Sequence, residues 1–387
     1  KTSALLKSKG KPSDRRIAIQ TKVDAGTLEP NPRTGLGRSV PRSWIQVGAV
    51  YFIEDGEIGT PVLIEEVCSA SLRLLQPEFV PYERLRPRSV SLLPVAVACE
   101  AACPFCFSKA SVSLDQAARV PDLVRARDVL SRAKGAGAGR AVITGGGEPG
   151  MLGAEALASL VAACADCYDK VVLITNGFFL SKGGEFDRLE TLSQLGRAGL
   201  RVLAISRHHF EAGRNAALMR LDARAEETAA LLSSARRRQE LRGLTLRWIC
   251  VLQKGGVDSP DELGRYLSWA VKTGAAEVCF KELYVATSHE SVYHSRPANE
   301  WSARHQVPLN LVVAFARERG WRVAQRLPWG APIYEGRWDG HPVRVAAYTE
   351  PSLFWERSQG VSRSWNMMAD GTCLASLEDR RSEVLPR

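Results

Sequence analysis

The sequence predicts an α/β fold in which strands and helices alternate six times through the middle of the chain. Apolar runs typical of buried strands are followed by stretches in which apolar residues recur every three to four positions. Strands that alternate with helices pair in parallel, because each crossover helix returns the chain to the end of the sheet at which the previous strand began. An open sheet and a full or partial (β/α) barrel both fit this pattern. In either, ligand chemistry gathers at the carboxyl ends of the strands.

The predicted strands and helices of this region are short and regularly spaced. Strands are expected at 89–98, 140–147, 170–179, 200–206, 244–252 and 276–285, and helices at 121–137, 153–170, 186–199, 227–238 and 259–275. Helices end near glycines such as Gly199 and Gly274, as C-caps require. Ser259, followed by Pro260 and Glu262, is typical of a helix start.

The flanks of this region differ from it in composition. Residues 1–43 are rich in Gly, Pro, Ser and Lys and read as a disordered tail. Residues 44–90 contain short β-rich runs with a turn at Asp55-Gly56, which predicts a small antiparallel β module. We assign residues 91–324 to the α/β core. Residues 325–387, with a hairpin signal at Asp339-Gly340, are expected to form a C-terminal β-rich extension.

The positive charge of the chain is concentrated in the tail. Of the formal net charge of +10, the first 43 residues carry ten Lys or Arg and three acids, which leaves +3 for the rest. A solvated tail is the simpler interpretation. A tail that contacts RNA or another polyanion is the alternative, so nucleic acid remains a candidate partner.

The composition indicates a soluble, reduced protein. No apolar run approaches the length of a membrane helix, so no membrane is expected as a partner. Nine cysteines scattered over 387 residues are typical of reduced thiols and not of a disulfide framework. We therefore expect a cytoplasmic protein.

Three cysteines lie within eight residues directly after the first predicted strand of the core. Cys99, Cys103 and Cys106 have the spacing C-x3-C-x2-C. Thiolates are soft ligands that select zinc, copper(I) or iron–sulfur clusters. A [4Fe–4S] cluster has four corners and normally takes four thiolates, so three of them leave one iron open to a non-protein ligand.

This motif resembles that of the radical S-adenosylmethionine (radical SAM) superfamily, and the rest of the core agrees. TGGGEP, residues 144–149, ends the second predicted strand, ITNG ends the third at 174–177, and AIS ends the fourth at 204–206. The resemblance covers about residues 91–285. It implies a partial, TIM-like (β/α)6 radical SAM barrel, flanked by the N-terminal β module and the C-terminal β-rich extension.

The resemblance also implies roles for particular residues. Cys99, Cys103 and Cys106 would hold the [4Fe–4S] cluster. The remaining residues would bind SAM: Gly146, Gly147 and Glu148 its amino group, Ser206 its ribose or carboxylate, Asn176 at a neighbouring strand end, and Phe105 beside the adenine. Glycines let the backbone approach a ligand closely, and a carboxylate complements an ammonium group.

The implied activity is reductive cleavage of SAM at the cluster. The 5′-deoxyadenosyl radical so formed would abstract a hydrogen from a small-molecule or peptide substrate, and a flavodoxin or ferredoxin would supply the electron. Such cofactors carry the hard chemistry, while the protein orients them and excludes water. Two alternatives stay open: radical SAM modification of a nucleic acid or nucleotide, and a non-catalytic Fe–S or zinc-binding regulatory protein.

Three further residues are candidates for the substrate side of the site. His208 follows the fourth predicted strand, and its neighbour His209 should point the opposite way if the strand continues. Glu282 and Tyr284 end the sixth strand and share parity, so both are expected to face the lumen. For His208 a role in a surface loop is an equal alternative, and for Glu282 and Tyr284 a salt bridge or a position at the barrel rim.

Cysteines outside the triplet offer weaker candidates. Cys164 and Cys167 form a C-x2-C pair on a predicted helix, where two small buried residues are the simpler interpretation than a second cluster. Cys373 lies in the C-terminal extension, where a hydrogen-donor thiol is an alternative to a structural cysteine.

Overall fold

A computed structural model describes most of the chain beyond residue 79. The described residues are 80–107, 122–181, 183–221, 228, 230–232, 241–286, 291–351 and 353–386, with the backbone of five two-residue strands between 45 and 63. The predicted tail 1–43 lies outside the described residues, and so does most of the predicted helix at 227–238.

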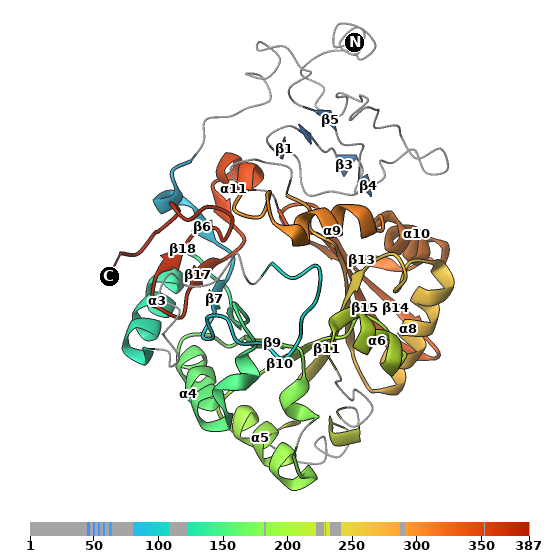
Figure 1. The fold of residues 1–387 in the computed structure, drawn as a ribbon, viewed down its shortest axis with the longest axis horizontal. Coiled ribbons are helices and arrows are strands. Elements are labelled where there is room, and N and C mark those ends of the chain that lie inside the picture. The colour runs from blue at the N-terminus through green and yellow to red at the C-terminus, as the bar shows by residue number, and fades with distance from the viewer. Residues whose placement is uncertain are drawn as a thin grey trace, which may run out of the picture.

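Eight parallel strands form the main sheet, which confirms the predicted α/β class (Figure 1). From one edge to the other they are β17 (Trp365–Met367), β7 (Val90–Leu92), β8 (Ala141–Ile143), β9 (Val171–Thr175), β10 (Val202–Ser206), β11 (Thr245–Leu252), β12 (Glu277–Glu282) and β15 (His341–Tyr348). Their order and curvature make a partial, TIM-like barrel.

Residues 325–387 contribute strands at both edges of this sheet. β15 pairs in parallel with β12, where Arg344 faces Glu277, and β17 pairs in parallel with β7, where Trp365 faces Val90. Three antiparallel strands extend the edges: β13 (Arg322–Arg326) and β14 (Pro332–Trp338) beyond β15, and β18 (Cys373–Leu374) beyond β17. The C-terminal extension is therefore part of the barrel wall.

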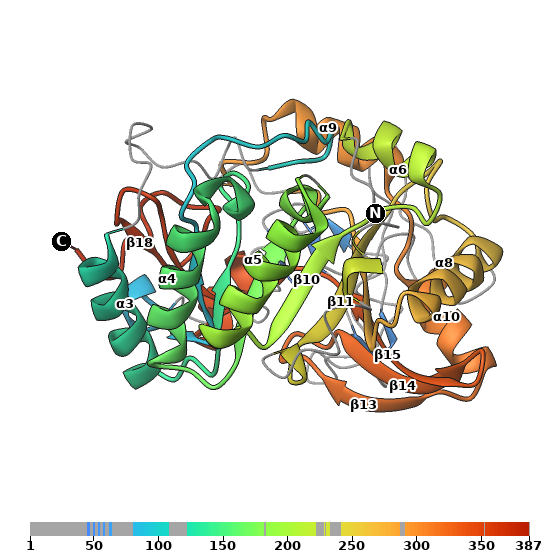
Figure 2. The same cartoon turned by 90° about the horizontal axis from the view of Figure 1, so that it is seen from below.

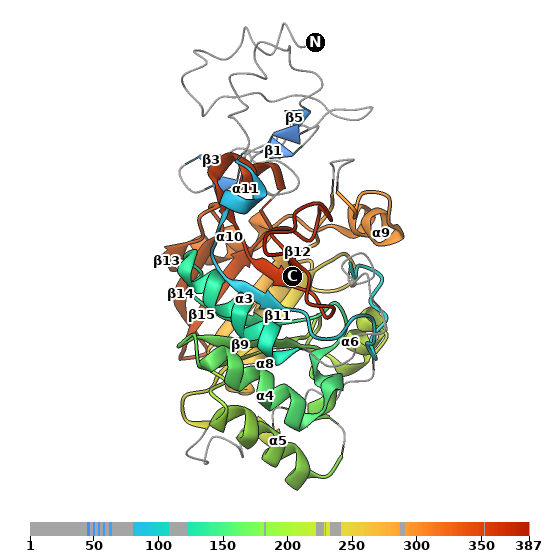
Figure 3. The ribbon, with the colours of Figure 1, turned by 90° about the vertical axis from the view of Figure 1, so that its left-hand side faces the viewer.

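Helices pack around the outside of the sheet (Figure 1). They are α3 (Leu123–Gly135), α4 (Ala154–Ala165), α5 (Glu185–Arg197), α6 (Ala212–Met219), α8 (Pro260–Lys272), α9 (Pro297–His305), α10 (Asn310–Glu318) and α11 (Leu353–Gln359). Figure 3 shows α3, α4 and α5 stacked along one side of the molecule. The N-cap predicted at Ser259 is confirmed, since its side chain accepts a hydrogen bond from the backbone N–H of Glu262.

Short 3-10 helices and paired segments complete the core. The 3-10 helices are η2 (Tyr82–Arg84), η3 (Pro149–Leu152) and η4 (Phe178–Leu180). β6 (Arg86–Pro87) and β16 (Val361–Ser362) pair in parallel, which ties the C-terminal region to the segment before β7. η3 and η4 follow β8 and β9 directly, so both lie near the strand ends where the site is expected.

The strands bury their two faces in separate cores. Outward-facing residues such as Ile143, Leu173 and Phe280 join the large core formed with the helices. A smaller apolar cluster contains strand residues alone, and it fills part of the barrel interior: Val142, Val172, Val202 and Ala204, with Ile174 and Ile249 against them. Alternate residues along a strand point to opposite faces of the sheet, so these two clusters identify which residues of each strand face the helices and which face the lumen.

The carboxyl ends of the strands meet at one end of the barrel. In Figure 2 the β10 arrow points toward this end, and the segment after β7, coloured cyan, runs across it close to α9. The three cysteines belong to this cyan segment. They therefore lie where the sequence predicts the ligand-binding end.

Within residues 45–63 the structure describes only short antiparallel strand pairs. β1 (Ile45–Gln46), β2 (Ala49–Val50) and β5 (Val62–Leu63) form one small sheet, and β3 (Ile53–Glu54) pairs with β4 (Glu57–Ile58). This pairing is the kind expected for the N-terminal β module. Among the described helices, none combines the length and the apolar character that crossing a membrane requires.

Candidate functional site

The loop after β7 is held against the segment that follows β8. Gly147 N–H donates to the carbonyl of Val95 at 2.8 Å, and Glu148 N–H donates to the carbonyl of Ala98 at 2.7 Å. The backbones approach so closely that a Cβ on Gly147 would lie 2.2 Å from the Ala98 oxygen. Glycine at 147 is therefore required for the cysteine loop to lie on the Glu148 segment.

The three cysteines follow this contact. Cys99 and Cys106 are exposed, while Cys103 is half-buried, with its Sγ 3.5 Å from the carbonyl oxygen of Met219 at the end of α6. Burial, and then the neighbouring thiols, raise the pKa of Cys103 to about 12, and the cation of Arg220 acts against this rise. Burial also raises the pKa of Cys99. A bound metal would reverse these shifts, because it favours the thiolate.

The donor set of this loop suits an iron–sulfur cluster. Three thiols on one loop influence one another electrostatically, as the pKa shifts of Cys99 and Cys103 show. Soft thiolates are the ligands that such clusters take. The described residues contain no group of three or more His, Cys, Asp or Glu side chains already positioned to hold a metal ion. The three cysteines are therefore not yet gathered around one point. They fit the cluster because they are thiols and because they lie on one loop.

Glu148 is buried at the end of β8, with three protein donors around its carboxylate. Its Oε1 accepts hydrogen bonds from Gly150 N–H at 2.8 Å and the Thr175 hydroxyl at 2.5 Å, and its Oε2 accepts one from Asn176 N–H at 2.8 Å. Burial raises the pKa of Glu148, and these hydrogen bonds oppose the rise. The carboxylate is thereby fixed in orientation, with acceptor capacity remaining on Oε2.

Asn176 connects Glu148 with the cysteine loop. Its side-chain Nδ2 lies 3.7 Å from Cys99 Sγ and 3.3 Å from an oxygen of Glu100, and its Oδ1 accepts a hydrogen bond from Phe178 N–H at 2.8 Å. The end of β9 therefore contacts both groups. Sequence reasoning missed the role of its neighbour Thr175, for which only its place before Asn-Gly at a strand end was a signal.

Ser206 ends β10 on the lumen side. It has the parity of Val202 and Ala204, which belong to the inner apolar cluster. In the part of the chain that the structure describes, its hydroxyl has no hydrogen-bond partner. A hydroxyl on the lumen wall without a protein partner can bind a ligand, as predicted for this residue.

Phe105 and His208 pack together at the mouth of the barrel. Their rings meet edge to face with centroids 5.1 Å apart, and Trp301 on α9 lies 5.7 Å from Phe105. His208 Nδ1 accepts a hydrogen bond from Val251 N–H at 3.0 Å, so a neutral ring carries its proton on Nε2. Burial, and then the cations of Arg207 and Lys281, lower the pKa of His208 to about 3. His208 is therefore neutral at physiological pH.

The comparison with protein families decides the assignment of this arrangement. Residues 93–239 match the family model described as the radical SAM superfamily, and this stretch contains the three cysteines, Glu148, Asn176 and Ser206. The chain carries a radical SAM domain. The match covers this domain and less than half of the chain; it supports an enzyme, with the reaction subclass open.

Solved structures of radical SAM enzymes resemble the chain at low identity. SuiB from Streptococcus suis, solved with bound S-adenosylmethionine, is 16% identical, with 75% of this chain and 60% of that chain covered and a TM-score of 0.47. HemN from Escherichia coli, a coproporphyrinogen III oxidase, is 15% identical over 62% and 54%, with a TM-score of 0.38. The chain thus spans less than two thirds of the proteins it resembles. No curated protein matches it.

His209 lies outside the mouth of the radical SAM domain. Its Nδ1 accepts a hydrogen bond from Glu211 N–H at 3.0 Å, and its Nε2 lies 3.1 Å from an oxygen of Glu262 on α8. His208 instead bonds to β11, so the two adjacent histidines do point to different surroundings, as expected from their spacing. His209 joins the fourth strand end to α8 and is a structural residue.

Glu282 turns toward the helices, and the expectation that it faces the lumen is wrong. It shares parity with Val278 and Phe280, which are buried in the outer core. Its oxygens accept hydrogen bonds from Gln306 Nε2 at 3.0 Å and from the Thr349 hydroxyl at 2.9 Å. The side chains of β12 that face the lumen are instead the partly buried ones, and Lys281 is the last of these along the strand.

Tyr284 lies beyond the end of β12 in an aromatic group. Its ring centroid is 5.8 Å from that of Phe107, which follows the cysteines, and 6.0 Å from that of Tyr293. This contact brings Tyr284 to the cysteine loop by packing. Its predicted role toward a substrate stays a prediction.

Two of the cysteines outside the triplet, Cys164 and Cys373, are buried in the outer core. Cys164 and Cys373 both pack there with helix residues, and burial raises the pKa of each to about 12. For Cys164 this agrees with the simpler interpretation of a small buried residue. Cys373 packs away from the lumen, which does not suit a thiol that donates hydrogen to a substrate.

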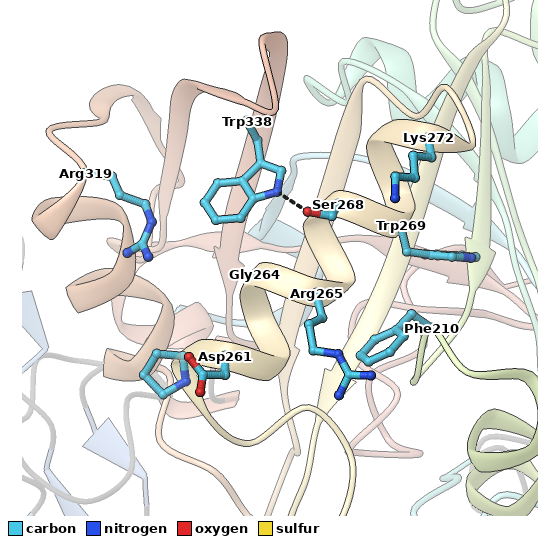
Figure 4. A pocket seen from close by; sticks show the side chains of 10 residues that line it. Phe210, Asp261, Gly264, Arg265, Ser268, Trp269, Lys272, Arg319 and Trp338 are labelled. Carbon is cyan, nitrogen blue, oxygen red and sulfur yellow. Dashed lines mark hydrogen bonds between the residues drawn. The ribbon is translucent and has the colours of Figure 1, made fainter.

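A separate hollow of about 660 Å³ lies on the outside of the radical SAM domain, along α8 (Figure 4). Its wall includes Trp338 on β14, whose indole N–H donates to the Ser268 hydroxyl at 2.8 Å, and Trp269 on α8. Arg265 lies over the Phe210 ring, 4.5 Å from its centroid. Neither the cysteines nor Glu148 lines this hollow, so it is distinct from the site at the barrel mouth.

Proposed function

We propose that the chain is a radical SAM enzyme that generates a 5′-deoxyadenosyl radical and abstracts a hydrogen from a small-molecule or peptide substrate. One observation supports this most: the backbone contact of Gly147 and Glu148 with the cysteine loop. It brings the thiols, the buried carboxylate of Glu148 and the side chain of Asn176 to one end of the barrel. A tight turn of purely structural use would not need a buried acid beside three thiols.

The residues of this chain would divide the work as follows. Cys99, Cys103 and Cys106 would hold a [4Fe–4S] cluster, which when bound supplies the electron that breaks the C5′–S bond of SAM. Glu148 would accept the ammonium group of SAM at its remaining acceptor site, and Ser206 would bind SAM through its free hydroxyl. Phe105 and His208 would close the mouth and exclude water from the reacting groups.

The proposal is tested by SAM cleavage in the reconstituted protein. The full chain is loaded with iron and sulfide without oxygen, reduced with dithionite and given SAM, and 5′-deoxyadenosine is measured. Wild-type protein should form it, whereas Cys103→Ala should lose both the cluster absorbance and the product. Cys167→Ala, at a half-buried cysteine just beyond the carboxyl end of α4, should keep both. A protein that binds cluster and SAM but forms no 5′-deoxyadenosine would refute the enzyme and favour a regulatory Fe–S protein.

An electron donor of the flavodoxin or ferredoxin type is part of this proposal. The thiols lie at an open end of the barrel, with Cys99 and Cys106 exposed, which gives a donor access. The cationic side chain of Arg220 is exposed at the same end. Acidic donors associate faster with such a surface.

A further inference from the structure

The interior of the barrel has one apolar wall and one charged wall. Val172, Ile174 and Ala204, from β9 and β10, represent the apolar side. On the side of β12 and β15, the lumen parity carries Lys281 and Tyr348, which are paired with each other across the two strands. A barrel whose interior served only as a packed core would carry apolar side chains on both of these walls.

Four polar groups make contact on the charged wall. Lys281 Nζ lies 2.5 Å from Oε1 of Glu350, and Arg363 forms an ion pair with Oε2 of the same carboxylate. The Tyr348 hydroxyl donates to Glu350 at 3.1 Å, and Lys281 lies 5.4 Å from the centre of the Tyr348 ring. Two cations thus share one acid. Their side chains keep 32% and 28% of their surface accessible.

The charged wall lies near the proposed SAM site. Lys281 pairs with Val251 across β12 and β11, and the N–H of Val251 donates to His208 Nδ1 at 3.0 Å, while the His208 ring packs against Phe105 in the cysteine loop. Lys281 is therefore within electrostatic reach of the barrel mouth. A substrate that reaches the reacting groups from the lumen would pass this wall.

Cations exceed acids in the described part of this lumen. Arg247 is neutralised by Glu277, at 2.7 Å. Arg140, at the start of β8, makes no ion pair with an acid among the described residues, and neither does Lys170 at the start of β9. Burial is the main cause that lowers the pKa of Arg140, and the neighbouring cations Arg247, Arg88 and Arg363 lower it in the same direction.

We propose that the substrate carries a carboxylate or phosphate group, which binds in the lumen between Lys281 and Arg363. This rests on the proposed function and names the substrate class for the same site. Among the described residues the two side chains form ion pairs with one acid, Glu350, so an incoming anion finds a donor set that is already assembled. Glu350 would hold both cations in place and compete with the anion for them.

The test is anion binding to the full chain, reconstituted with its cluster and saturated with SAM, so that the SAM site is filled. Succinate and inorganic phosphate serve as probes, and their affinity is measured by titration calorimetry. Lys281→Gln and Arg363→Gln should each weaken binding roughly tenfold, the size of one lost charged hydrogen bond. Glu350→Gln should strengthen it, because both cations lose their competitor. Lys272→Gln, with the same charge change on the outside of α8, should leave it unchanged.

The outcomes separate this inference from the proposed function. If SAM is bound and cleaved but wild-type protein binds neither probe, the anionic substrate class is wrong and the radical SAM activity stands. If Lys272→Gln weakens binding as much as Lys281→Gln does, the effect is one of net charge, which also overturns the inference. Lys281→Arg, which keeps the cation, should bind like wild type and serves as the control for folding. Whichever probe binds more tightly identifies the group on the substrate.

Discussion

At the scale of single residues, the carboxylate of Glu148 keeps one hydrogen-bond acceptor position that no protein donor occupies. Three protein donors occupy its two oxygens, and they come from Gly150, Thr175 and Asn176. A carboxylate has about four acceptor positions, so one remains for a cationic ligand. The same three bonds fix the side chain, so that little conformational entropy is lost when the ligand binds.

We predict that Glu148→Gln weakens SAM binding by more than tenfold, because the charged hydrogen bond to the ammonium group is lost. The amide NH2 also cannot accept, so at least one protein donor loses its partner, which should lower the free energy of unfolding by about 1–3 kcal/mol. Titration calorimetry with SAM and urea denaturation measure the two effects. Glu155→Gln, at an exposed position of α4, is the control and should change neither.

His208 should make the protein less stable in acid. Its folded pKa of about 3 lies below the ordinary value of 6.5, so between these values the unfolded chain binds more protons than the native one. Stability contributed by the neutral ring is therefore complete above pH 6.5 and declines as the pH falls toward 3. Urea denaturation at several pH values should show a smaller decline for His208→Gln than for wild type. An equal decline in both would mean that His208 is protonated in the native state.

The sequence predicted the cysteines, Glu148, Asn176 and Ser206 at successive strand ends, because these motifs are local and strand ends follow from periodicity. It placed Glu282 wrongly, since parity was assigned without knowing which parity faces the helices. Val278 and Phe280 decide that question, and both lie in the outer core. Lys281, their polar neighbour of opposite parity, was therefore not assigned to the lumen.

At the scale of elements, the cysteine loop depends on the strand beside it. Backbone hydrogen bonds from Gly147 and Glu148 hold the start of the loop, and the rings of Phe105 and Phe107 pack its later part against the barrel mouth.

We predict that Gly147→Ala displaces this loop. The added Cβ would meet the Ala98 oxygen at 2.2 Å and the Val95 side chain at 2.8 Å, so a backbone shift is unavoidable. Such overpacking typically costs about 1–3 kcal/mol, and the cluster content of the reconstituted protein should fall with it. Gly139→Ala is the matched control, because its Cβ would meet nothing within 4 Å. Full cluster content in Gly147→Ala would show that the loop does not need this contact.

The roles of β15 and β17 could not be predicted at this scale. Hairpin signals identified the C-terminal region as β-rich, but pairing partners are a property of long-range contacts. β17 pairs with β7 across more than 270 residues, and the buried hydroxyls of Ser91 and Ser364 lie 2.8 Å apart beside that pairing. The local sequence pattern predicts that a strand forms. Which strand it pairs with depends on which edge strands of the sheet are still unpaired.

At the scale of the whole molecule, positive side chains gather in two places, the lumen of the barrel and its mouth. The lumen holds Lys281, Arg363 and Arg140, for which we propose an anionic substrate. The mouth exposes Arg220, in the left-handed conformation with φ of 50° after α6 and close enough to Cys103 to influence its thiol. The two positive regions would serve different partners, because one is enclosed by strands and the other faces solvent.

We predict that Arg220 speeds reduction by an acidic flavodoxin. Arg220→Asn removes the charge without new strain, since asparagine tolerates the left-handed conformation. The rate of reduction by flavodoxin should fall at least threefold at low salt, and the difference should vanish at high salt, where surface charges are screened. Stopped-flow measurement of cluster bleaching gives this rate. The small reductant dithionite has no protein surface to recognise, so its rate should be the same for both proteins. A loss with dithionite as large as that with flavodoxin would mean that Arg220 acts on the cluster itself and not on the docking of a donor.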